Sequence, residues 1–378
     1  MKIAHVNMFF WPTFGGVEEV MYELAIRQAK EGYEVHVFCS DSDKEKRIKK
    51  KYEIKDNIHI HRSPYWIRLS LSTHIFPGLI KELSKEKFDI IHSHVSGHWY
   101  ILIAGIIARI KGTKHIHTTH CPWTDKYRRK LLQFLLIFND LFLNRIAFSL
   151  TDRIIAITPW EIPILKKWVS EDKIKVIPNG MPNYFFKKVK NNKFKKKLGL
   201  KGKIVLFFGR FNITKGADIL ALATKELVKE RKDINFIFVG PDEGIKQKVK
   251  DIVKGESRIK ILEPIRGESR VEVYQSADLF VLPSYREGLP LTLFEAMASG
   301  LPIIASPVNG VPFEMKNIEN GYFVNYGDIK GLKEKITKIL DNPKIAKKMS
   351  QNNLKKAKNY SWDLIAKRYM DEYNKLIT

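Results

Sequence analysis

The stretch that decides the fold is PSYREGLPLTLFEAMASG, residues 283–300. A largely apolar run at 277–282 precedes it and predicts a buried strand that ends in a Pro-Ser turn. After the turn the apolar positions recur at helical spacing, and a Gly-Leu-Pro sequence predicts where that helix stops. Glu287 therefore precedes the helix and Glu295 lies inside it, so both carboxylates are expected to border one crevice at the carboxyl end of a sheet.

The start of this predicted helix is suited to an anion. Backbone amides of Gly288, Leu289 and nearby residues have no helical partners there, and the helix dipole adds positive potential at the same end. Carboxylates that hold sugar hydroxyls would then stand beside amides that hold a phosphate. We take residues 288–290 as candidate ligand-binding positions.

Glu287 and Glu295, with seven residues between them, resemble the E-x7-E motif of the retaining GT-B glycosyltransferases of family 4, the group-1 glycosyl transferases. The resemblance implies an α/β protein of two doubly wound, Rossmann-like domains that face each other across a cleft. Residues 1–185 would form the acceptor-side domain, 186–360 the nucleotide-sugar domain, and 361–378 a helix that crosses back to the first domain. It also implies a nucleoside diphosphate sugar as donor substrate, with no cofactor and no metal.

Two basic residues follow an apolar strand predicted at 204–208 and match the family pattern G-R-x4-K-G. Arg210 and Lys215 flank a strand-to-helix crossing, where a guanidinium can chelate a phosphate and an ammonium adds a point charge. By resemblance they stabilise the leaving diphosphate, while Glu287 holds the sugar and Glu295 the ribose. Gly240 ends a later strand, in a loop suited to pass under the nucleotide.

The first half opens with a βαβ pattern. A strand predicted at 2–10 leads to Gly15 and Gly16 at a helix start, where small residues let backbone amides approach a diphosphate, and a second strand is predicted at 34–38. The glycine pair is similar to the N-terminal Gly-Gly loop of the family, which makes both glycines candidate donor-binding residues.

Six histidines lie near the ends of two predicted strands and could be read as a metal site: His92, His94, His98, His115, His117 and His120. Strand-end histidines commonly satisfy hydrogen bonds of the core, and zinc usually recruits a carboxylate or a thiolate as well. We therefore predict no metal. His120 follows the strand predicted at 114–119 and resembles the family histidine that contacts the donor sugar.

The chain carries 66 Lys and Arg against 41 Asp and Glu, a net charge of +25. Nine lysines and no acid fall within residues 187–203, the connector between the predicted domains. Polyanions are natural partners of such a field, and a lysine-rich, heat-adapted surface explains it equally well. Residues 126–148 combine a basic cluster with bulky apolar residues, which indicates either an interfacial helix on an anionic membrane or a core helix between two layers.

Cys39 and Cys121 are the only cysteines, so no disulfide framework is expected. The sequence shows no leader pattern, and no apolar run approaches the roughly 18 residues of a membrane span, which predicts a cytoplasmic protein, peripheral at the inner membrane face if the interfacial helix is real.

The predicted activity is transfer of a hexose-type sugar to a glycan or a lipid-linked acceptor. A nucleotide-sugar epimerase of the same fold is an alternative, although those enzymes lack the combined Arg, Lys and E-x7-E set. A basic nucleic-acid-binding protein is a second alternative, but no recognition motif for nucleic acid is present, and we expect none as a partner.

Overall fold

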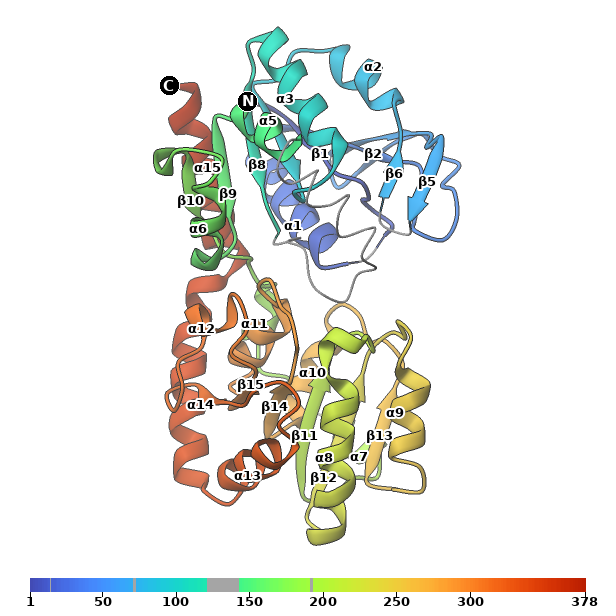
Figure 1. The fold of residues 1–378 in the computed structure, drawn as a ribbon, viewed down its shortest axis with the longest axis vertical. Helices are drawn as coiled ribbons and strands as arrows, with labels where there is room; N and C mark the ends of the chain where they lie inside the picture. The colour runs from blue at the N-terminus through green and yellow to red at the C-terminus, as the bar shows by residue number, and fades with distance from the viewer. Residues whose placement is uncertain (14, 71–72, 121–142, 191–192) are drawn as a thin grey trace. The chain divides into compact units, whose positions relative to one another are not determined.

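The computed structural model describes residues 1–13, 15–70, 73–120, 143–190 and 193–378, which divide into two compact units (Figure 1). Unit 1 comprises Met1–Gly180 together with Trp362–Thr378, and unit 2 comprises Met181–Ser361. The first division falls at residues 180 and 181, where the sequence placed it at 185 and 186. The C-terminal segment of unit 1 begins at Trp362 rather than at residue 361.

Unit 1 is built on a sheet of eight strands, all parallel except the edge strand β3. Their spatial order is β10 (Ile174–Val176), β9 (Arg153–Ala156), β8 (Lys114–Thr118), β7 (Ile90–His94), β1 (Lys2–Val6), β2 (Glu34–Ser40), β4 (Ile58–Ser63) and β3 (Tyr52–Lys55). A separate hairpin pairs β5 (Ile67–Ser70) with β6 (Thr73–Ile75). Since the chain adds strands on one side of β1 and then on the other, β1 and β7 are neighbours at the point where the order reverses.

Helices cover both faces of this sheet. α1 (Gly16–Lys30) packs with β2 and β4, and α15 (Trp362–Ile377) packs against α1. α2 (Gly78–Ser84) and α3 (Trp99–Lys111) share a core with β1 and β7 on the other face. Strand alternation sends Ala4 and Val6 of β1 to this second core, so His5 faces the side of α1 and α15. The remaining described helices of the unit are short: α5 (Asn144–Ser149), α6 (Ile162–Leu165) and the 3-10 turns η2 (Pro159–Glu161) and η3 (Glu171–Lys173).

The first strand of unit 1 is shorter than predicted. It ends at Val6 rather than at residue 10, because Asn7 turns the chain and its side-chain Nδ2 donates to the carbonyl of Phe9 (2.9 Å). The charged run at 44–55 ends in β3, which completes the edge beside β4. After β9 the chain forms the short elements η2 and α6 in place of one continuous helix.

Unit 2 carries a six-stranded, fully parallel sheet. The spatial order is β13 (Ile259–Leu262), β12 (Ile234–Val239), β11 (Lys203–Phe208), β14 (Leu279–Leu282), β15 (Ile303–Ala305) and β16 (Gly321–Phe323). β11, β12 and β14 read as continuous apolar runs because both faces of a parallel sheet are buried. The order reverses between β11 and β14, so the loops after these two strands open at the same switch point.

α8 (Ala217–Glu230), α9 (Lys246–Ile252) and α13 (Ile329–Leu340) share one core with the strands (Figure 1). α11 (Leu291–Ala298) packs against α14 (Pro343–Ala357), and α10 (Ser269–Ser276) contacts α7 (Phe194–Lys197). Three further short elements are η4 (Asn183–Phe186), η5 (Ile213–Lys215) and α12 (Val311–Glu314), and η6 (Lys358–Tyr360) ends the unit. The strand, turn and helix predicted around residues 277–300 are confirmed as β14, a loop and α11.

Candidate functional site

The loops after β11 and β14 are joined through their backbones. The amide of Tyr285 donates to the carbonyl of Thr214 (2.9 Å). Gly216 has φ +68°, and a Cβ at this position would lie 2.0 Å from the carbonyl oxygen of Pro283. Only glycine therefore permits this approach, which brings η5 against the turn that carries Glu287.

The loop after β12 joins the same edge. Gly240 has φ +155°, and a Cβ there would lie 1.8 Å from the carbonyl oxygen of Gly209. The carboxylate of Asp242 accepts the amides of Gly244 (2.8 Å) and Lys246 (3.1 Å), and these backbone hydrogen bonds lower the pKa of Asp242. Gly240, expected beneath the nucleotide, thus allows two loops to touch at the switch point.

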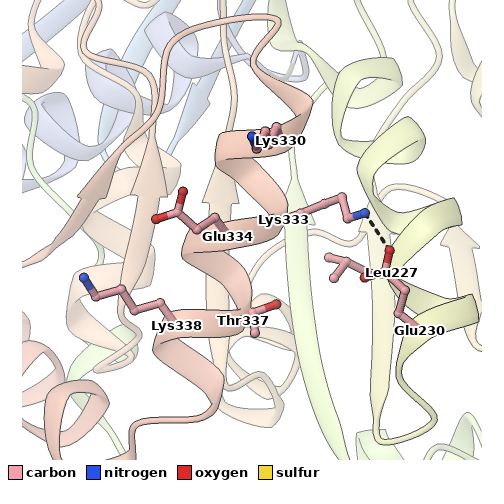
Figure 2. A pocket seen from close by; sticks show the side chains of 7 residues that line it. All are labelled: Leu227, Glu230, Lys330, Lys333, Glu334, Thr337 and Lys338. Atoms are coloured by element: carbon pink, nitrogen blue, oxygen red, sulfur yellow. Dashed lines mark hydrogen bonds and ion pairs between the residues drawn. The ribbon is translucent and has the colours of Figure 1, made fainter.

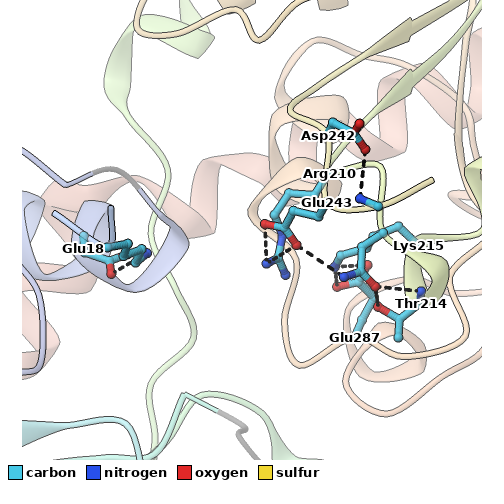
Figure 3. Close-up of polar contacts among 10 residues, drawn as sticks. Glu18, Arg210, Thr214, Lys215, Asp242, Glu243 and Glu287 are labelled. Carbon is cyan, nitrogen blue, oxygen red and sulfur yellow. Dashed lines mark hydrogen bonds and ion pairs between the residues drawn. The ribbon is translucent and has the colours of Figure 1, made fainter. Parts of the chain in front are cut away.

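Lys215 and Glu287 form a buried ion pair at the centre of this edge (Figure 3). Lys215 Nζ lies 2.7 Å from each carboxylate oxygen, and the hydroxyl of the buried Ser284 donates to Oε1 (2.7 Å). The side chains are 16% and 4% exposed, so neither charge has enough water to be stable alone. Two residues predicted to act together are thus in direct contact, although 72 positions separate them.

Removing only the lysine should show how strongly an unpaired, buried carboxylate destabilises the protein. We expect Lys215→Met to lower the free energy of unfolding by about 3 kcal/mol, because Glu287 is left buried without its counter-charge. Lys215→Met combined with Glu287→Gln should recover most of that loss, since the neutral amide can still accept from Ser284. Urea denaturation measures both. Equal stability of the single variant and the wild type would contradict the burial argument.

Arg210 is held differently. Its Nη1 lies 3.1 and 3.0 Å from the two carboxylate oxygens of Glu243 (Figure 3), and Asn212 Nδ2 donates to the same carboxylate (3.3 Å). The Arg210 and Glu243 side chains are 56% and 36% exposed, so the pair is weak and easily exchanged for another anion. Glu243, which sequence reasoning did not single out, occupies the guanidinium in the structure.

Neutralising Glu243 should therefore free Arg210 for a phosphate. We expect Glu243→Gln to tighten binding of a nucleoside diphosphate about two- to fivefold, the scale of an exposed ion pair. Isothermal titration calorimetry measures the dissociation constant. Glu226→Gln is the matched control, because it removes one charge from the pairs with Lys333 on α8 and α13 and should leave binding unchanged. Weaker binding by Glu243→Gln would contradict the competition.

Glu295 lies inside α11 and is 1% exposed. Arg270 of α10 pairs with its Oε1, donates to the hydroxyl of Tyr184 (2.7 Å) and lies over the ring of Phe185 at 5.3 Å. Tyr184 and Phe185 belong to η4, which follows shortly after Met181, the first residue of unit 2. Arg270 therefore ties the expected ribose carboxylate to this segment, a role that no local motif in the sequence indicated.

The helix start at residues 288–290 agrees in part with the prediction. Pro290 is the N-cap of α11 and has no N–H, so it offers shape rather than a donor. Within residues 193–378, the amide nitrogens of Gly288 and Leu291 donate no hydrogen bond to another protein atom. These amides can serve as anion donors beside Lys215 and Glu287.

In unit 1 the glycine loop carries an unexpected carboxylate. Gly15 is the N-cap of α1, and a Cβ on it would lie 2.1 Å from Oε2 of Glu18. Glu18 is 7% exposed and pairs with Lys44 Nζ (2.9 Å), while Gly16 has open space where a Cβ would lie. Glu18 stands at the helix end that favours anions, so a diphosphate at Gly15 and Gly16 would have to accommodate it.

His120 follows β8 in a left-handed conformation, φ +54°. Val95, at the end of the neighbouring strand β7, has φ +66°, which is rare for a β-branched residue. Both strained positions lie at the carboxyl edge of the sheet. His120 Nε2 contacts His94 Nδ1 at 3.2 Å. Residues held in this rarely populated conformation often occur at functional sites.

The other predicted strand histidines serve as core hydrogen-bonding groups. His115 and His117 both contact Ser93 Oγ at 2.9 Å, and His117 also contacts Ser96 Oγ at 2.9 Å. Two groups in the described chain have metal-ligating atoms close together: one is His5, His92 and His94, the other Glu34, His36 and Glu86. In the first group every ring nitrogen already has a hydrogen-bond partner. That bonding favours the structural reading over a metal site.

Burial gives these histidines a pH signature. It lowers the pKa of His5 and His115 to about 4 and that of His120 to about 3. Between about pH 6.5 and pH 4 the unfolded chain therefore binds protons that the folded chain does not. As the pH is lowered through this window, we expect the free energy of unfolding to decrease by up to about 1.4 kcal/mol per pH unit for each such histidine.

Urea midpoints of the full chain at pH 7 and pH 5 measure this effect. His115→Gln should reduce the difference between the two midpoints, because it removes one buried imidazole. A flat dependence in the wild type would contradict the neutral, buried state of the cluster.

An open groove of about 380 Å³ lies between α8 and α13, away from the carboxyl edge of the sheet (Figure 2). Its lining includes Lys333, which bonds Glu226 (2.8 Å) and Glu230 (2.7 Å). These ion pairs neutralise Lys333, and the groove contains none of the predicted site residues.

Among the described residues, none of the helices is long and apolar enough to cross a bilayer. The predicted interfacial segment 126–148 lies outside the described residues up to position 142, as does Cys121. Its last residues enter α5, which contacts α3 and buries Phe148. Residues 191 and 192 of the lysine-rich connector are also outside the description.

Comparison with known families gives two adjacent matches. Residues 14–182 match the family described as Glycosyltransferase Family 4, and residues 188–356 match Glycosyl transferases group 1. The chain is 29% identical to the UDP-Gal:alpha-D-GlcNAc-diphosphoundecaprenol alpha-1,3-galactosyltransferase of Escherichia coli, over 93% of this chain and 91% of that protein. It is 25% identical to the phosphatidylinositol N-acetylglucosaminyltransferase GPI3 subunit of Saccharomyces cerevisiae, over 99% and 83% of the two chains.

Solved structures give the same fold. Anabaena HepE in complex with UDP superposes with a TM-score of 0.80 at 18% identity, covering 99% of this chain and all of that one. HepE has also been solved with UDP-glucose, with a TM-score of 0.78. The fold of two parallel α/β units is therefore of the GT-B class.

Proposed function

The chain belongs to the family-4, group-1 glycosyltransferases, and we propose that it transfers a hexose from a nucleoside diphosphate sugar to a lipid-linked or glycan acceptor with retention of anomeric configuration. The observation that carries this proposal is the contact of Lys215 with Glu287, close to Gly288, at the β11/β14 switch point. A cation, a carboxylate and helix-start amides there match the needs of a departing diphosphate and of the sugar attached to it.

Charge develops on the β-phosphate as the bond from C1 to its oxygen breaks. Lys215 Nζ has three N–H donors and directs two of them to Glu287, so the third remains for a phosphate oxygen. Arg210 would leave Glu243 and bind the same diphosphate, and the amide of Gly288 would add a neutral donor. These groups supply positive potential without a metal, which we propose as the basis of a metal-independent reaction.

The remaining candidates receive roles by the same reasoning. Glu295, fixed by Arg270, would accept the ribose hydroxyls, and Glu287 would hold sugar hydroxyls or the developing positive ring. Gly240, Leu289 and Pro290 would shape the nucleotide contact. We assign Gly15, Gly16 and His120 of unit 1 to the phosphate and sugar of the donor. The acceptor oxygen would bond to C1 on the face that the phosphate leaves, and its proton would pass to the phosphate.

The donor and acceptor classes are proposed from the relatives. The Escherichia coli relative is named for UDP-Gal and a diphosphoundecaprenol-linked acceptor, and HepE binds UDP and UDP-glucose. We therefore propose a UDP-hexose donor and a lipid-linked acceptor. The basic charge of residues 187–203 suits an anionic membrane surface, which would place the enzyme at the cytoplasmic face as a peripheral protein.

The test is release of UDP from a panel of UDP-hexoses, first without acceptor and then with polyprenol-diphosphate sugars or free oligosaccharides. Acceptors presented in anionic vesicles should react faster than the same acceptors in neutral micelles. Proton NMR of the product reports the anomeric configuration, and excess EDTA should leave the rate unchanged. Interconversion of the sugar nucleotide without any acceptor would instead indicate an epimerase.

Replacing Arg210 tests the charge-stabilising role directly. We expect Arg210→Ala to lower turnover about a hundredfold, the scale of losing one preorganised donor to developing charge. Lys330→Ala, which removes an exposed cation in the groove between α8 and α13, should retain the wild-type rate. A wild-type rate in Arg210→Ala would remove Arg210 from the mechanism.

A further inference from the structure

A continuous row of hydrogen bonds runs from the core of unit 1 to His120. Gln28 Oε1 lies 2.7 Å from His5 Nε2, His5 Nδ1 lies 3.0 Å from His94 Nε2, and His94 Nδ1 lies 3.2 Å from His120 Nε2. Gln28 lies on α1, His5 on β1 and His94 on β7, and His120 follows shortly after the end of β8. Gln28 and His5 are fully buried and His94 is 1% exposed, so water does not interrupt the row.

The imidazoles in this row are neutral at pH 7. Burial lowers the pKa of His5 to about 4 and that of His120 to about 3, and it places the pKa of His94 well below its ordinary value. A neutral imidazole has one N–H and one lone pair. Each ring that donates at one nitrogen must accept at the other, so the proton arrangement at one end determines the arrangement at the far end.

The side-chain amide of Gln28, at one end of the row, determines which ring nitrogens carry the protons. An amide oxygen only accepts, so His5 must carry its proton on Nε2. His5 Nδ1 then accepts from His94 Nε2–H, and His94 Nδ1 accepts from His120 Nε2–H. This order leaves His120 Nδ1 with a lone pair.

We propose that Gln28 is a positioning residue that acts through His5 and His94 to hold His120 in its Nε2–H tautomer, so that Nδ1 accepts a hydrogen bond from a hydroxyl of the sugar substrate. Only the sugar contact rests on the proposed function. The tautomer itself follows from the buried row. Reversal of the amide would reverse every ring and turn His120 Nδ1 into a donor.

A neighbouring row provides a matched control. Tyr373 Oη lies 2.5 Å from His92 Nδ1, and His92 Nε2 lies 2.7 Å from Thr118 Oγ1. The His92 ring lies beside the His94 ring at a tilt of 34°, with centroids 4.1 Å apart, but both of its nitrogens are used within its own row. Thr118→Val therefore disturbs the same buried layer without touching the path from Gln28 to His120.

The first measurement is made on the wild-type chain labelled with 15N-histidine. Long-range proton–nitrogen correlation spectra distinguish protonated from unprotonated ring nitrogens, and His120→Gln identifies the His120 signals. We expect His5, His94 and His120 all to be Nε2–H tautomers at pH 7. A His120 ring that carries its proton on Nδ1 overturns the proposal, whatever any variant does.

The second measurement uses Gln28→Leu, which removes the accepting oxygen at similar side-chain volume. A His5 Nε2–H would then be buried without a partner, so the row should reverse and His120 should become the Nδ1–H tautomer. Thr118→Val should leave the His120 tautomer unchanged. An unchanged His120 in folded Gln28→Leu overturns the proposal. If this variant does not fold, the wild-type spectrum still decides.

Turnover provides a separate readout. We expect Gln28→Leu to lower kcat/KM for the donor about two- to tenfold, the scale of one hydrogen bond to a neutral hydroxyl. One mono-deoxy analogue of the donor sugar should lose nothing further in Gln28→Leu, because the hydroxyl in question is already absent. Equal losses for every analogue would overturn the sugar contact. Absence of turnover in the wild type would instead refute the proposed function and leave the tautomer result standing.

Discussion

The contact between Lys215 and Glu287 is the interaction on which the candidate site of unit 2 depends. It links the loops of two strands that are neighbours in the sheet and 72 residues apart in the chain at this contact. Both charges are largely buried, so each requires the other, and the loops cannot separate without exposing an unpaired charge to the core. The close passages at Gly216 and Gly240 bring the three loops together around this pair.

In unit 1 the buried polar side chains are stabilised differently. Its switch point lies between β1 and β7, and the strand ends there carry imidazoles rather than an ion pair. Because burial keeps these rings neutral, hydrogen bonds alone satisfy them. The row carries no net charge, but its N–H donors all point the same way along it. The same parallel architecture thus supports a charged edge in one unit and a neutral, polarised edge in the other.

Sequence reasoning found the residues whose signal is local. Glu287 and Glu295 stand at fixed spacing around a helix start, and Arg210 and Lys215 follow a strand with glycines beside them. It missed Glu243, Arg270, Glu18 and Gln28, whose importance comes from partners far along the chain. No local sequence pattern indicated a role for Arg270, because its partners Tyr184 and Glu295 lie in different elements. The early end of β1 was missed because apolar periodicity does not show the side-chain hydrogen bond of Asn7, and β3 was missed because it forms by pairing with β4.

The sequence by itself determined the alternation of apolar strands and amphipathic helices, the glycine-bearing loops after the strands and the kind of charge that each loop carries. These properties are local, since strand and helix periodicity and turn chemistry act over a few residues. Only the tertiary structure decided that β11 lies beside β14 and β1 beside β7, and therefore which charges and imidazoles meet. Strand order depends on packing between distant segments, and a side chain's partner, protonation and tautomer follow from burial that no short stretch of sequence contains.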